Sequence, residues 1–336
     1  MSNLANPMSI CIIGNLNIDL IIRNVPKLPA WGQEVMGASR DQFSSGQAGY
    51  LAFALRHLGV ATSLIGNVGD DLYGHQILSD LRTRGVNIDG VSVMPGAKTG
   101  ISVAIVRSDG ERAFVTDLGC LADFSPTLIE PHWDRVESAA IVCLVGLFCI
   151  PGLSFTAAAG LLGRARQAGK ITMLDTGWDP GNWASETQAG MRTLLSQVSL
   201  FMPNQDEAQA ISGQETLDGM AVALQALGPE TVVIKCGENG SYARRGAATC
   251  HVPPRAVHVH DAVGAGDVFD AGFLFGLQRG WSLEACLAFG NTTASLYISR
   301  RQDRFPGLVE VAQTGREYPA LSALDDITRF VEGHHD

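Results

Sequence analysis

Patterns typical of short buried strands alternate with helical patterns through the middle of this sequence, and that order restricts the fold more than any other feature. The elements expected after Ala139 are, in order, strand 140–145, helix 154–168, strand 171–175, a helix near 191–197, strand 200–202, helices 206–212 and 217–227, and strand 231–235. Repeated strand–helix–strand units fold into a parallel sheet that helices cover on both faces. The sequence therefore predicts an α/β protein built on a parallel sheet.

Sheets of this kind bind their ligands beyond the carboxyl ends of the strands. The residues expected along that edge are Gly146, Asp175, Asn204 and the segment Lys235–Gly237. The stretch 261–267 is expected at the same edge, because it follows an alternating, strand-like segment at 256–260. This edge is the predicted place of a functional site.

The stretch Asp261–Asp267 reads D-A-V-G-A-G-D and precedes an apolar helical pattern. Small residues at the start of a helix leave backbone N–H groups without intrahelical partners, next to the positive end of the helix dipole. Such a turn binds anions, and phosphate is the usual one. Asp267 adds a carboxylate beside that anion, which suggests that it handles a proton. A second interpretation is close packing, with an acid that complements the helix dipole.

The N-terminal third carries polar residues that could face a ligand. Asn17 and Asp19 alternate along a predicted strand, so they share one face and could bind the hydroxyls of a polyol; a solvated strand edge is the alternative. The segment 26–40 is rich in proline and glycine and predicts a small flap. Strands 99–107 and 112–117 are expected to form a hairpin.

Charge and composition restrict the partners. The chain has 336 residues and a net charge of −10, which argues against nucleic acids and anionic membranes. A polyphosphate substrate would need a counter-cation such as Mg²⁺ to offset the repulsion. The nucleotide-binding patterns G-x-G-x-x-G and G-x-x-x-x-G-K-[S/T] and the serine-hydrolase pattern G-x-S-x-G are not found, which disfavours those enzyme classes.

The expected location is the cytoplasm. Seven cysteines include neither a C-x-x-C pair nor a Cys/His cluster with zinc spacing, which favours buried thiols in a reducing compartment. The N-terminus shows no pattern of a signal peptide. Residues 139–163 carry no charge, but Pro151 and Gly152 divide them into a strand and a helix, so a membrane span is not expected.

Several landmarks together resemble the ribokinase-like (PfkB) carbohydrate kinases. The stretch 261–267 is similar to the family's D-T-x-G-A-G-D, with Ala262 in place of threonine. Residues 66–74 are similar to G-x-V-G-x-D-x-x-G, and residues 203–208 to P-N-x-x-E-A. Shorter matches, to T-G, G-E-R and G-x-x-G, occur at 98–100, 110–112 and 236–240. The resemblance covers about residues 9 to 310, in family order.

The resemblance implies both fold and activity. It implies one ribokinase-like domain at 9–312, a three-layer α/β/α structure whose small β lid comes from about 20–43 and about 98–118, followed by a C-terminal helix or tail at 313–336. The activity it implies is transfer of the γ-phosphate of MgATP to a primary hydroxyl of a sugar or sugar derivative. A nucleoside kinase that stacks Tyr50 or Phe43 on a base is the alternative, and a catalytically silent binding protein is a third hypothesis. By the same resemblance, the lid could form a homodimer.

The resemblance also assigns roles to residues. Asp267 would be the general base, and the backbone N–H groups of Gly264, Ala265 and Gly266 would form the anion hole. The residues expected at the nucleotide are Asn204, Lys235, Gly237, Gly240 and Asn291, and Glu207 would order Mg²⁺ through water. Asn204 and Glu207 also fit a helix-capping pair, and Asn291 a buried helix amide. The acceptor would be bound by Asn17, Asp19, Gly46, Gln47 and Tyr50.

Two departures from the family pattern bear on the substrate and on cations. The usual G-G-x-x-x-N of the sugar site reads Ser45–Tyr50 here. A tyrosine in place of the amide predicts a pocket that differs from a standard ribose or fructose pocket. Ala262 and the segment 302–304 depart from the parts that often build a monovalent-cation site, while Asp261 remains. Activation by K⁺ is therefore left open.

Overall fold

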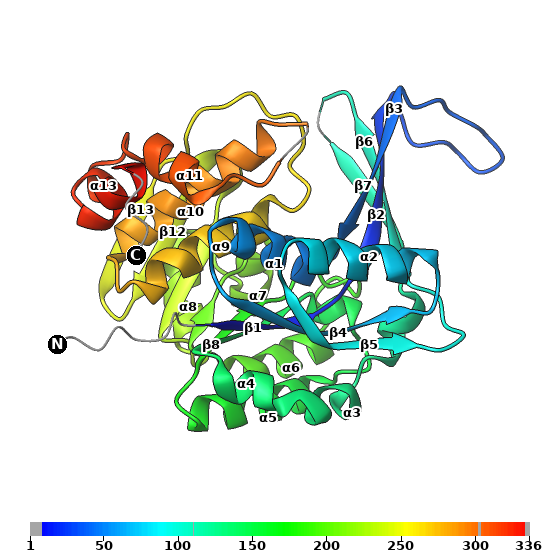
Figure 1. Cartoon of the computed structure of the whole chain (residues 1–336), viewed down its shortest axis with the longest axis horizontal. Coiled ribbons are helices and arrows are strands. Elements are labelled where there is room, and N and C mark those ends of the chain that lie inside the picture. The colour runs from blue at the N-terminus through cyan, green and yellow to red at the C-terminus, as the bar shows by residue number, and fades with distance from the viewer. Residues whose placement is uncertain (1–8, 110, 302–303, 333–336) are drawn as a thin grey trace.

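A nine-stranded sheet forms the centre of the computed structural model, which describes residues 9–109, 111–301 and 304–332 (Figure 1). The strand order is β13-β12-β11-β10-β9-β8-β1-β4-β5, and the pairs from β11 to β5 are parallel, whereas β11/β12 and β12/β13 are antiparallel. The strands are β1 (Ile10–Gly14), β4 (Thr62–Gly69), β5 (Asn87–Met94), β8 (Ile141–Val145), β9 (Ile171–Asp175), β10 (Leu200–Phe201), β11 (Thr231–Lys235), β12 (Ser241–Arg245) and β13 (Ala248–Val252). The predicted, mostly parallel central sheet is confirmed.

Helices cover both faces of this sheet, because the central strands are apolar on both sides. In β1, Ile10 and Ile12 belong to one buried cluster, and Cys11 and Ile13 belong to the other. The first cluster packs under α1 (Gln47–His57), α2 (Leu72–Thr83), α9 (Ala265–Gln278), α10 (Leu283–Ile298), α11 (Leu308–Gly315), α12 (Pro319–Ser322) and α13 (Asp325–Glu332). The second packs under α3 (Pro126–Ile129), α4 (Trp133–Ser138), α5 (Phe155–Gln167), α6 (Ser185–Leu195), α7 (Gln205–Ser212) and α8 (Leu217–Gln225). The three-layer prediction is therefore confirmed.

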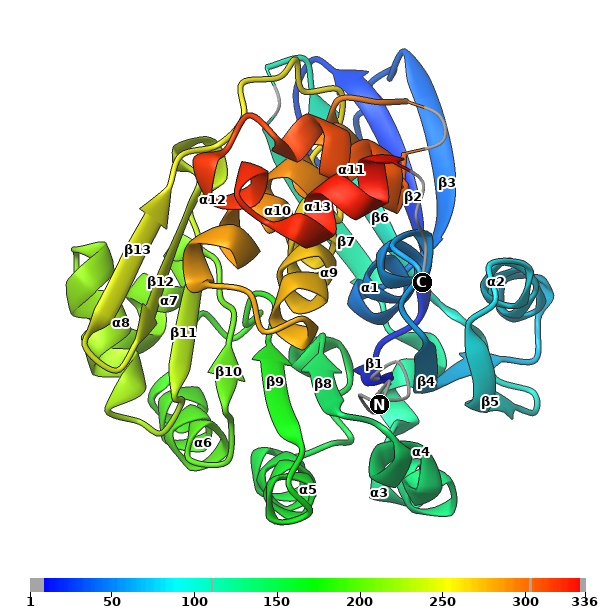
Figure 2. The same ribbon diagram turned by 60° about the vertical axis from the view of Figure 1, so that its left-hand side comes forward.

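A second, four-stranded sheet rises from the body beside α1 and α2 (Figures 1 and 2). Its order is β3-β2-β6-β7, with β2 (Asn17–Val25), β3 (Ser39–Ser45), β6 (Gly100–Arg107) and β7 (Arg112–Asp117). The expected hairpin is the antiparallel pair β6/β7. This sheet is the predicted small β lid, and the loop between β2 and β3 extends from its outer edge (Figure 1).

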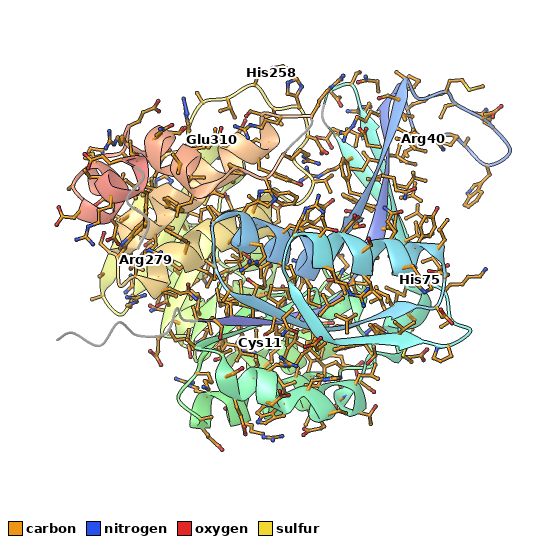
Figure 3. All side chains as sticks on the ribbon, viewed as in Figure 1. Cys11, Arg40, His75, His258, Arg279 and Glu310 are labelled. Atoms are coloured by element: carbon orange, nitrogen blue, oxygen red, sulfur yellow. The ribbon has the colours of Figure 1, made fainter. Side chains whose placement is uncertain are left out.

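One predicted strand is wrong. Residues 256–260 alternate like a strand, but they form no ladder and lie in the loop between β13 and α9. Pro253 and Pro254 end the pairing with the sheet. The backbone N–H of His260 instead donates to the carbonyl of Ile298 at the end of α10 (2.8 Å). His258 projects from this loop at the edge of the molecule, whereas Cys11 lies inside the body (Figure 3).

Some sequence features fall outside this description. Gly110 of the G-E-R match and residues 302–303 of the departing segment lie outside the described residues. Among the residues that are described, no helix combines the length and apolar character needed to cross a membrane.

Candidate active site

The carboxyl ends of the parallel strands meet the beginning of α9 at one edge of the large sheet. Asp175 ends β9, Lys235 ends β11, and Asn204, just after β10, forms a parallel bridge with Lys235. A Cβ atom on Gly266 would lie 3.3 Å from Lys235 Nζ, so the first turn of α9 touches the end of β11. The edge predicted from strand order therefore brings these residues beside the stretch 261–267.

The turn before α9 requires glycine at position 264. Gly264 is left-handed (φ 80°), a conformation that glycine adopts without steric cost. A Cβ atom there would lie only 2.8 Å from Tyr50 Cδ1 and 3.0 Å from the hydroxyl of Tyr297. The helix then starts at Ala265, whose N–H donates to the carbonyl of Ala262 (3.2 Å). The Ala265 N–H would thus have to leave or share that bond to serve in an anion hole.

Asp267 lies in the first turn of α9 with 7% of its surface exposed. Burial and the charge of Asp175 raise the pKa of Asp267 well above its usual range, while Lys235 and a hydrogen bond from Gln47 act against this. Gln47 Nε2 lies 3.4 Å from Asp267 Oδ1. A carboxyl group whose pKa is moved toward neutrality is suited to take a proton near neutral pH.

Lys235 is the cation around which the acids at this edge gather. Its Nζ lies 2.6 Å from Asp175 Oδ2 and 3.3 Å from Asp270 Oδ2. Burial acts to lower the pKa of Lys235, but the charges of Asp175, Asp270 and Glu207 outweigh burial and raise it. Lys235 therefore stays charged, and it offsets part of the negative charge around Asp267.

Asn204 and Glu207 form a complete capping box at the start of α7. The Glu207 N–H donates to Asn204 Oδ1 (2.9 Å), and Glu207 accepts from the backbone N–H (3.0 Å) and the side-chain amide (2.7 Å) of Asn204. Burial and the charge of Asp175 raise the pKa of Glu207 to about 7, with Lys235 acting in the opposite direction. The capping interpretation is thus correct. Both side chains also line the cavity described next.

A cavity of about 750 Å³ extends from this edge toward α10 and the lid. This volume lies within the usual range of small-molecule sites. The expected site residues on its wall are Gln47, Asn204, Glu207, Lys235, Gly237, Gly240, Gly264, Ala265, Gly266, Asp267 and Asn291. Apolar side chains, among them Val257, Val259 and Ile298, line it beside α10.

Two of these wall positions are fixed by the local backbone. Gly240 closes the turn between β11 and β12 with φ 85°, and a Cβ atom there would lie 2.1 Å from the carbonyl of Val252. Asn291 donates its side-chain amide to the carbonyls of Val252 (3.1 Å) and Pro253 (3.2 Å). Asn291 is thus a hydrogen-bonded buried amide, as one of its two interpretations had it, and it still contributes to the wall.

A second group of expected residues lies at the base of the lid. Asn17 donates to Asp19 Oδ1 (2.9 Å), and the Tyr50 hydroxyl donates to Asp19 Oδ2 (2.8 Å). Burial raises the pKa of Asp19 to about 6, while hydrogen bonds from Tyr50, Ser45 and Asn17 act to lower it. Gly46 is the N-cap of α1, directly before Gln47. Among the described residues, Asn17, Asp19, Gly46 and Tyr50 do not belong to the wall of the 750 Å³ cavity.

Sequence reasoning missed three charged residues of this region as site residues. Asp175 was expected at the sheet edge but had no assigned role, and it forms the shortest contact with Lys235. Asp270 follows Asp267 by three residues, so it lies on the same side of α9; an acid that recurs at this spacing in an apolar helix was the available signal. Arg304 contacts Asp261 from a distant part of the chain, and no pattern in the sequence predicts that contact.

Comparison with known proteins decides the family. The family model described as "pfkB family carbohydrate kinase" matches residues 8–309. The chain belongs to the pfkB family of carbohydrate kinases. An uncharacterized sugar kinase of Archaeoglobus fulgidus is 31% identical over 248 residues, which cover 73% of this chain and 94% of the relative. The ribokinase of Bacillus subtilis is 27% identical, with 86% and 92% covered.

Solved structures agree with this pfkB kinase in fold. The Arabidopsis thaliana ribokinase complexed with ribose and ATP superposes with a TM-score of 0.78 at 24% identity, covering 93% of this chain and 99% of the other. The Methanocaldococcus jannaschii nucleoside kinase, described as an archaeal member of the ribokinase family, gives a TM-score of 0.74 at 19% identity and covers 94% and 100%. These superpositions show the ribokinase-like fold. The phosphotransferase activity with a hydroxyl group as acceptor follows from membership of the pfkB family of carbohydrate kinases.

Proposed function

We propose that this enzyme transfers the γ-phosphate of ATP to a primary hydroxyl of a sugar or sugar derivative, with Asp267 as the general base. One observation carries the proposal: Asp267 lies in the first turn of α9, beside the left-handed Gly264, on the wall of a 750 Å³ cavity. Phosphoryl transfer depends mainly on positioning and charge stabilisation. A base directly next to backbone N–H donors supplies both parts at one place.

Each part of the site has a role in this proposal. The N–H groups of Gly264, Ala265 and Gly266 bind the transferred phosphoryl group, since donors fixed in advance stabilise developing charge without reorganising. Asp267 accepts the proton of the attacking hydroxyl, which lies between Asp267 and Asp19. Asn204, Lys235, Gly237, Gly240 and Asn291 hold the nucleotide along the cavity.

The charge of the cavity supports a requirement for Mg²⁺. Asp175, Glu207 and Asp267 line the cavity around Lys235, so the acids outnumber the cation at that end and would repel a polyphosphate. Among the described residues, no group of three or more His, Cys, Asp and Glu is arranged to enclose a metal ion. Mg²⁺ usually keeps several waters and binds through phosphates and one or two carboxylates. We assign Glu207 to its water shell, where the ion would neutralise phosphate charge.

A panel of acceptors tests the function. The enzyme is incubated with MgATP and single sugars, sugar acids, polyols or nucleosides, and the products are identified by mass spectrometry. The proposal expects one class of sugar or sugar derivative to gain a phosphoryl group in an ATP- and Mg²⁺-dependent manner. Binding of MgATP without any phosphorylated product across the panel would instead support the silent binding protein.

A nucleoside acceptor is the second candidate, and one residue favours it. Phe114 of β7 is 50% exposed and lines the cavity from the lid, where a base could stack. The two aromatic residues considered first for stacking are less suited. Tyr50 is only 4% exposed, and the guanidinium of Arg304 lies over the ring of Phe43 at 5.3 Å. Nucleosides and free sugars in the same panel distinguish the two candidates.

Tyr50 is expected to restrict the acceptor. Its hydroxyl already occupies one oxygen of Asp19, and its ring packs against Tyr297 at 6.4 Å. An acceptor therefore finds fewer free polar groups here than an asparagine would offer, and we propose a substrate with fewer hydroxyls at this end than ribose has.

Removing the Tyr50 hydroxyl should shift the pH dependence of acceptor binding. In Tyr50→Phe, Asp19 loses a hydrogen bond that lowers its pKa, so the pKa of Asp19, now about 6, should rise. As the pH is lowered, acceptor binding that needs the ionised carboxylate of Asp19 should therefore begin to weaken at a higher pH in Tyr50→Phe than in the wild type. The measurement is the KM of the acceptor between pH 5.5 and 8.5. Tyr242→Phe is the control, because Tyr242 also donates to an aspartate, Asp218, at 2.7 Å. Equal pH profiles for wild type and Tyr50→Phe would exclude Asp19 as an acceptor ligand.

We also propose that two copies associate through the lid. The loop between β2 and β3 exposes three large apolar side chains: Trp31 is fully exposed, Met36 is 74% and Leu28 is 59% exposed. Grouped apolar residues on a surface indicate an interaction site. Trp31→Ser is expected to convert a dimer into a monomer in size-exclusion chromatography with light scattering. Val222→Ser on α8, an exposed apolar residue away from the lid, serves as the control. A monomeric wild type at all concentrations would contradict this proposal.

A location in the cytoplasm completes the proposal. All seven cysteines are unpaired thiols in the structure, and most of them are buried. Thiols of this kind are typical of reducing compartments.

A further inference from the structure

Arg304 points its guanidinium into the turn that leads to the proposed anion hole. Its Nη2 donates to the backbone carbonyls of Asp261 (3.2 Å) and Val263 (3.2 Å). Its Nη1 lies 2.9 Å from Asp261 Oδ2, an ion pair without the angle of a hydrogen bond. Arg304 is only 6% exposed. A buried cation is thus bound by three oxygen atoms of residues 261 and 263.

The surroundings hold this guanidinium in place. Its Cζ lies 4.1 Å from the ring centre of Tyr297 and 5.3 Å from that of Phe43, distances typical of cation–π contacts. The hydroxyl of Tyr297 donates to the same Val263 carbonyl (3.0 Å). Arg23 of the lid strand β2 donates to Asp261 Oδ2 (2.7 Å), so a second guanidinium shares that oxygen. The aspartate and the carbonyls are therefore already neutralised by side chains of the protein.

These oxygens are the ones that a monovalent cation at Asp261 would need. Carbonyl and carboxylate oxygens are the ligands that hard cations prefer. Here the same atoms accept N–H groups of a fixed positive charge, and a K⁺ ion in contact with them would lie next to that charge and be repelled. The residues present do not fit a dissociable cation at this place.

The turn that Arg304 binds is the one that positions Gly264. The Val263 carbonyl belongs to the peptide unit that joins Val263 to Gly264, and the Val263 N–H donates to Asp261 Oδ1 (2.9 Å). Fixing this peptide unit fixes the backbone N–H of Gly264. We propose that Arg304 is a built-in cation that holds this turn and replaces a dissociable monovalent cation, so that activity does not depend on K⁺. Arg304 is then a positioning residue.

The wild-type enzyme provides the first test. Its kcat and KM for MgATP are measured in KCl and in tetramethylammonium chloride at the same ionic strength, with the acceptor found in the panel. We expect equal values, and equal melting temperatures of the MgATP complex in the two salts. A several-fold higher kcat in KCl, or a clear rise in melting temperature with KCl, overturns the inference. The activity readout rests on the proposed function, whereas the melting temperature does not, so the two failures are distinguishable.

Arg304→Ala provides the second test. Its kcat should fall by about 10- to 100-fold, because a small misplacement of a positioning group has effects of that size. Millimolar guanidinium or K⁺ should restore part of the lost kcat, since either cation can enter the vacated space, and Arg304→Lys should retain more activity than Arg304→Ala. Arg301→Ala, which removes an exposed arginine near Arg304 in sequence, should show neither loss nor rescue. A folded Arg304→Ala enzyme with unchanged kcat, or with a loss that no cation restores, overturns the inference. If Arg304→Ala does not fold, the wild-type comparison and Arg304→Lys still decide.

Discussion

Replacing Asp267 with asparagine is expected to lower kcat by about 10²- to 10⁴-fold, the usual contribution of a positioned general base. Asparagine keeps the shape of the side chain but cannot accept the proton of the acceptor hydroxyl. The affinity for MgATP should change little, because the backbone donors of residues 264–266 remain. The measurements are kcat by a coupled assay that detects ADP and the affinity for a non-hydrolysable ATP analogue by calorimetry.

Stability measurements show whether the lower kcat of Asp267→Asn comes from loss of the base or from unfolding. Burial raises the pKa of Asp267, so its ionised form opposes folding at pH 8, and the neutral asparagine should not lower the melting temperature. Asp206→Asn is the matched control, since Asp206 is also an acid in the first turn of a helix but is exposed. Asp206→Asn should leave kcat unchanged. If Asp267→Asn turned over at the rate of the wild type, Asp267 would not be the base.

Replacing Lys235 with methionine is expected to destabilise the fold by about 3–5 kcal/mol at pH 8, the usual effect of removing one partner of a buried ion pair. Lys235 lies 2.6 Å from Asp175 and 3.3 Å from Asp270, and methionine would leave both carboxylates without their cation. Urea denaturation of both proteins gives the difference in the free energy of unfolding. Lys98→Met, which changes an exposed lysine, is the control and should have no such effect.

The decrease in the free energy of unfolding caused by Lys235→Met should depend on pH in a defined direction. The pKa values of Asp267 and Asp270 are raised above their usual range in the fold, and Lys235 lowers both, so its removal raises them further. An acid whose pKa is higher in the folded than in the unfolded state binds more protons when folded. Its ionisation therefore lowers stability as pH rises from the unfolded to the folded pKa. The difference between variant and wild type should grow from pH 5 to pH 8. A difference that is constant, or larger at pH 5, would contradict this electrostatic account.

The sheet and its functional edge could be predicted because they depend on local patterns. Strand and helix periodicity fixes the order of the elements, and the carboxyl ends of parallel strands must share one edge. That rule places Asp175 and Lys235 near the start of α9, and in the structure Lys235 contacts Asp175 and lies next to Gly266. The alternation of Asn17 and Asp19 likewise predicts a shared face, and their 2.9 Å hydrogen bond agrees with it.

The contacts that could not be predicted depend on packing between distant segments. Residues 256–260 have the alternation of a strand, but a strand also needs a partner, and two prolines end the sheet before them. The sequence also does not reveal that Tyr50 turns its hydroxyl to Asp19. The guanidinium of Arg304 reaches a turn that lies 41 residues earlier in the chain at Val263. These contacts decide the acceptor pocket and the cation requirement, so substrate and cation were the least defined parts of the sequence-based prediction.

A ligand-bound structure tests the central claim most directly. The enzyme is crystallised with a non-hydrolysable ATP analogue, Mg²⁺ and the acceptor identified in the panel. The account predicts the acceptor hydroxyl at hydrogen-bond distance from a carboxylate oxygen of Asp267, about 2.6–3.2 Å, with the terminal phosphate of the analogue at the N–H groups of residues 264–266. A hydroxyl that contacts a different acid, such as Asp175, or a terminal phosphate bound away from Gly264, would contradict it.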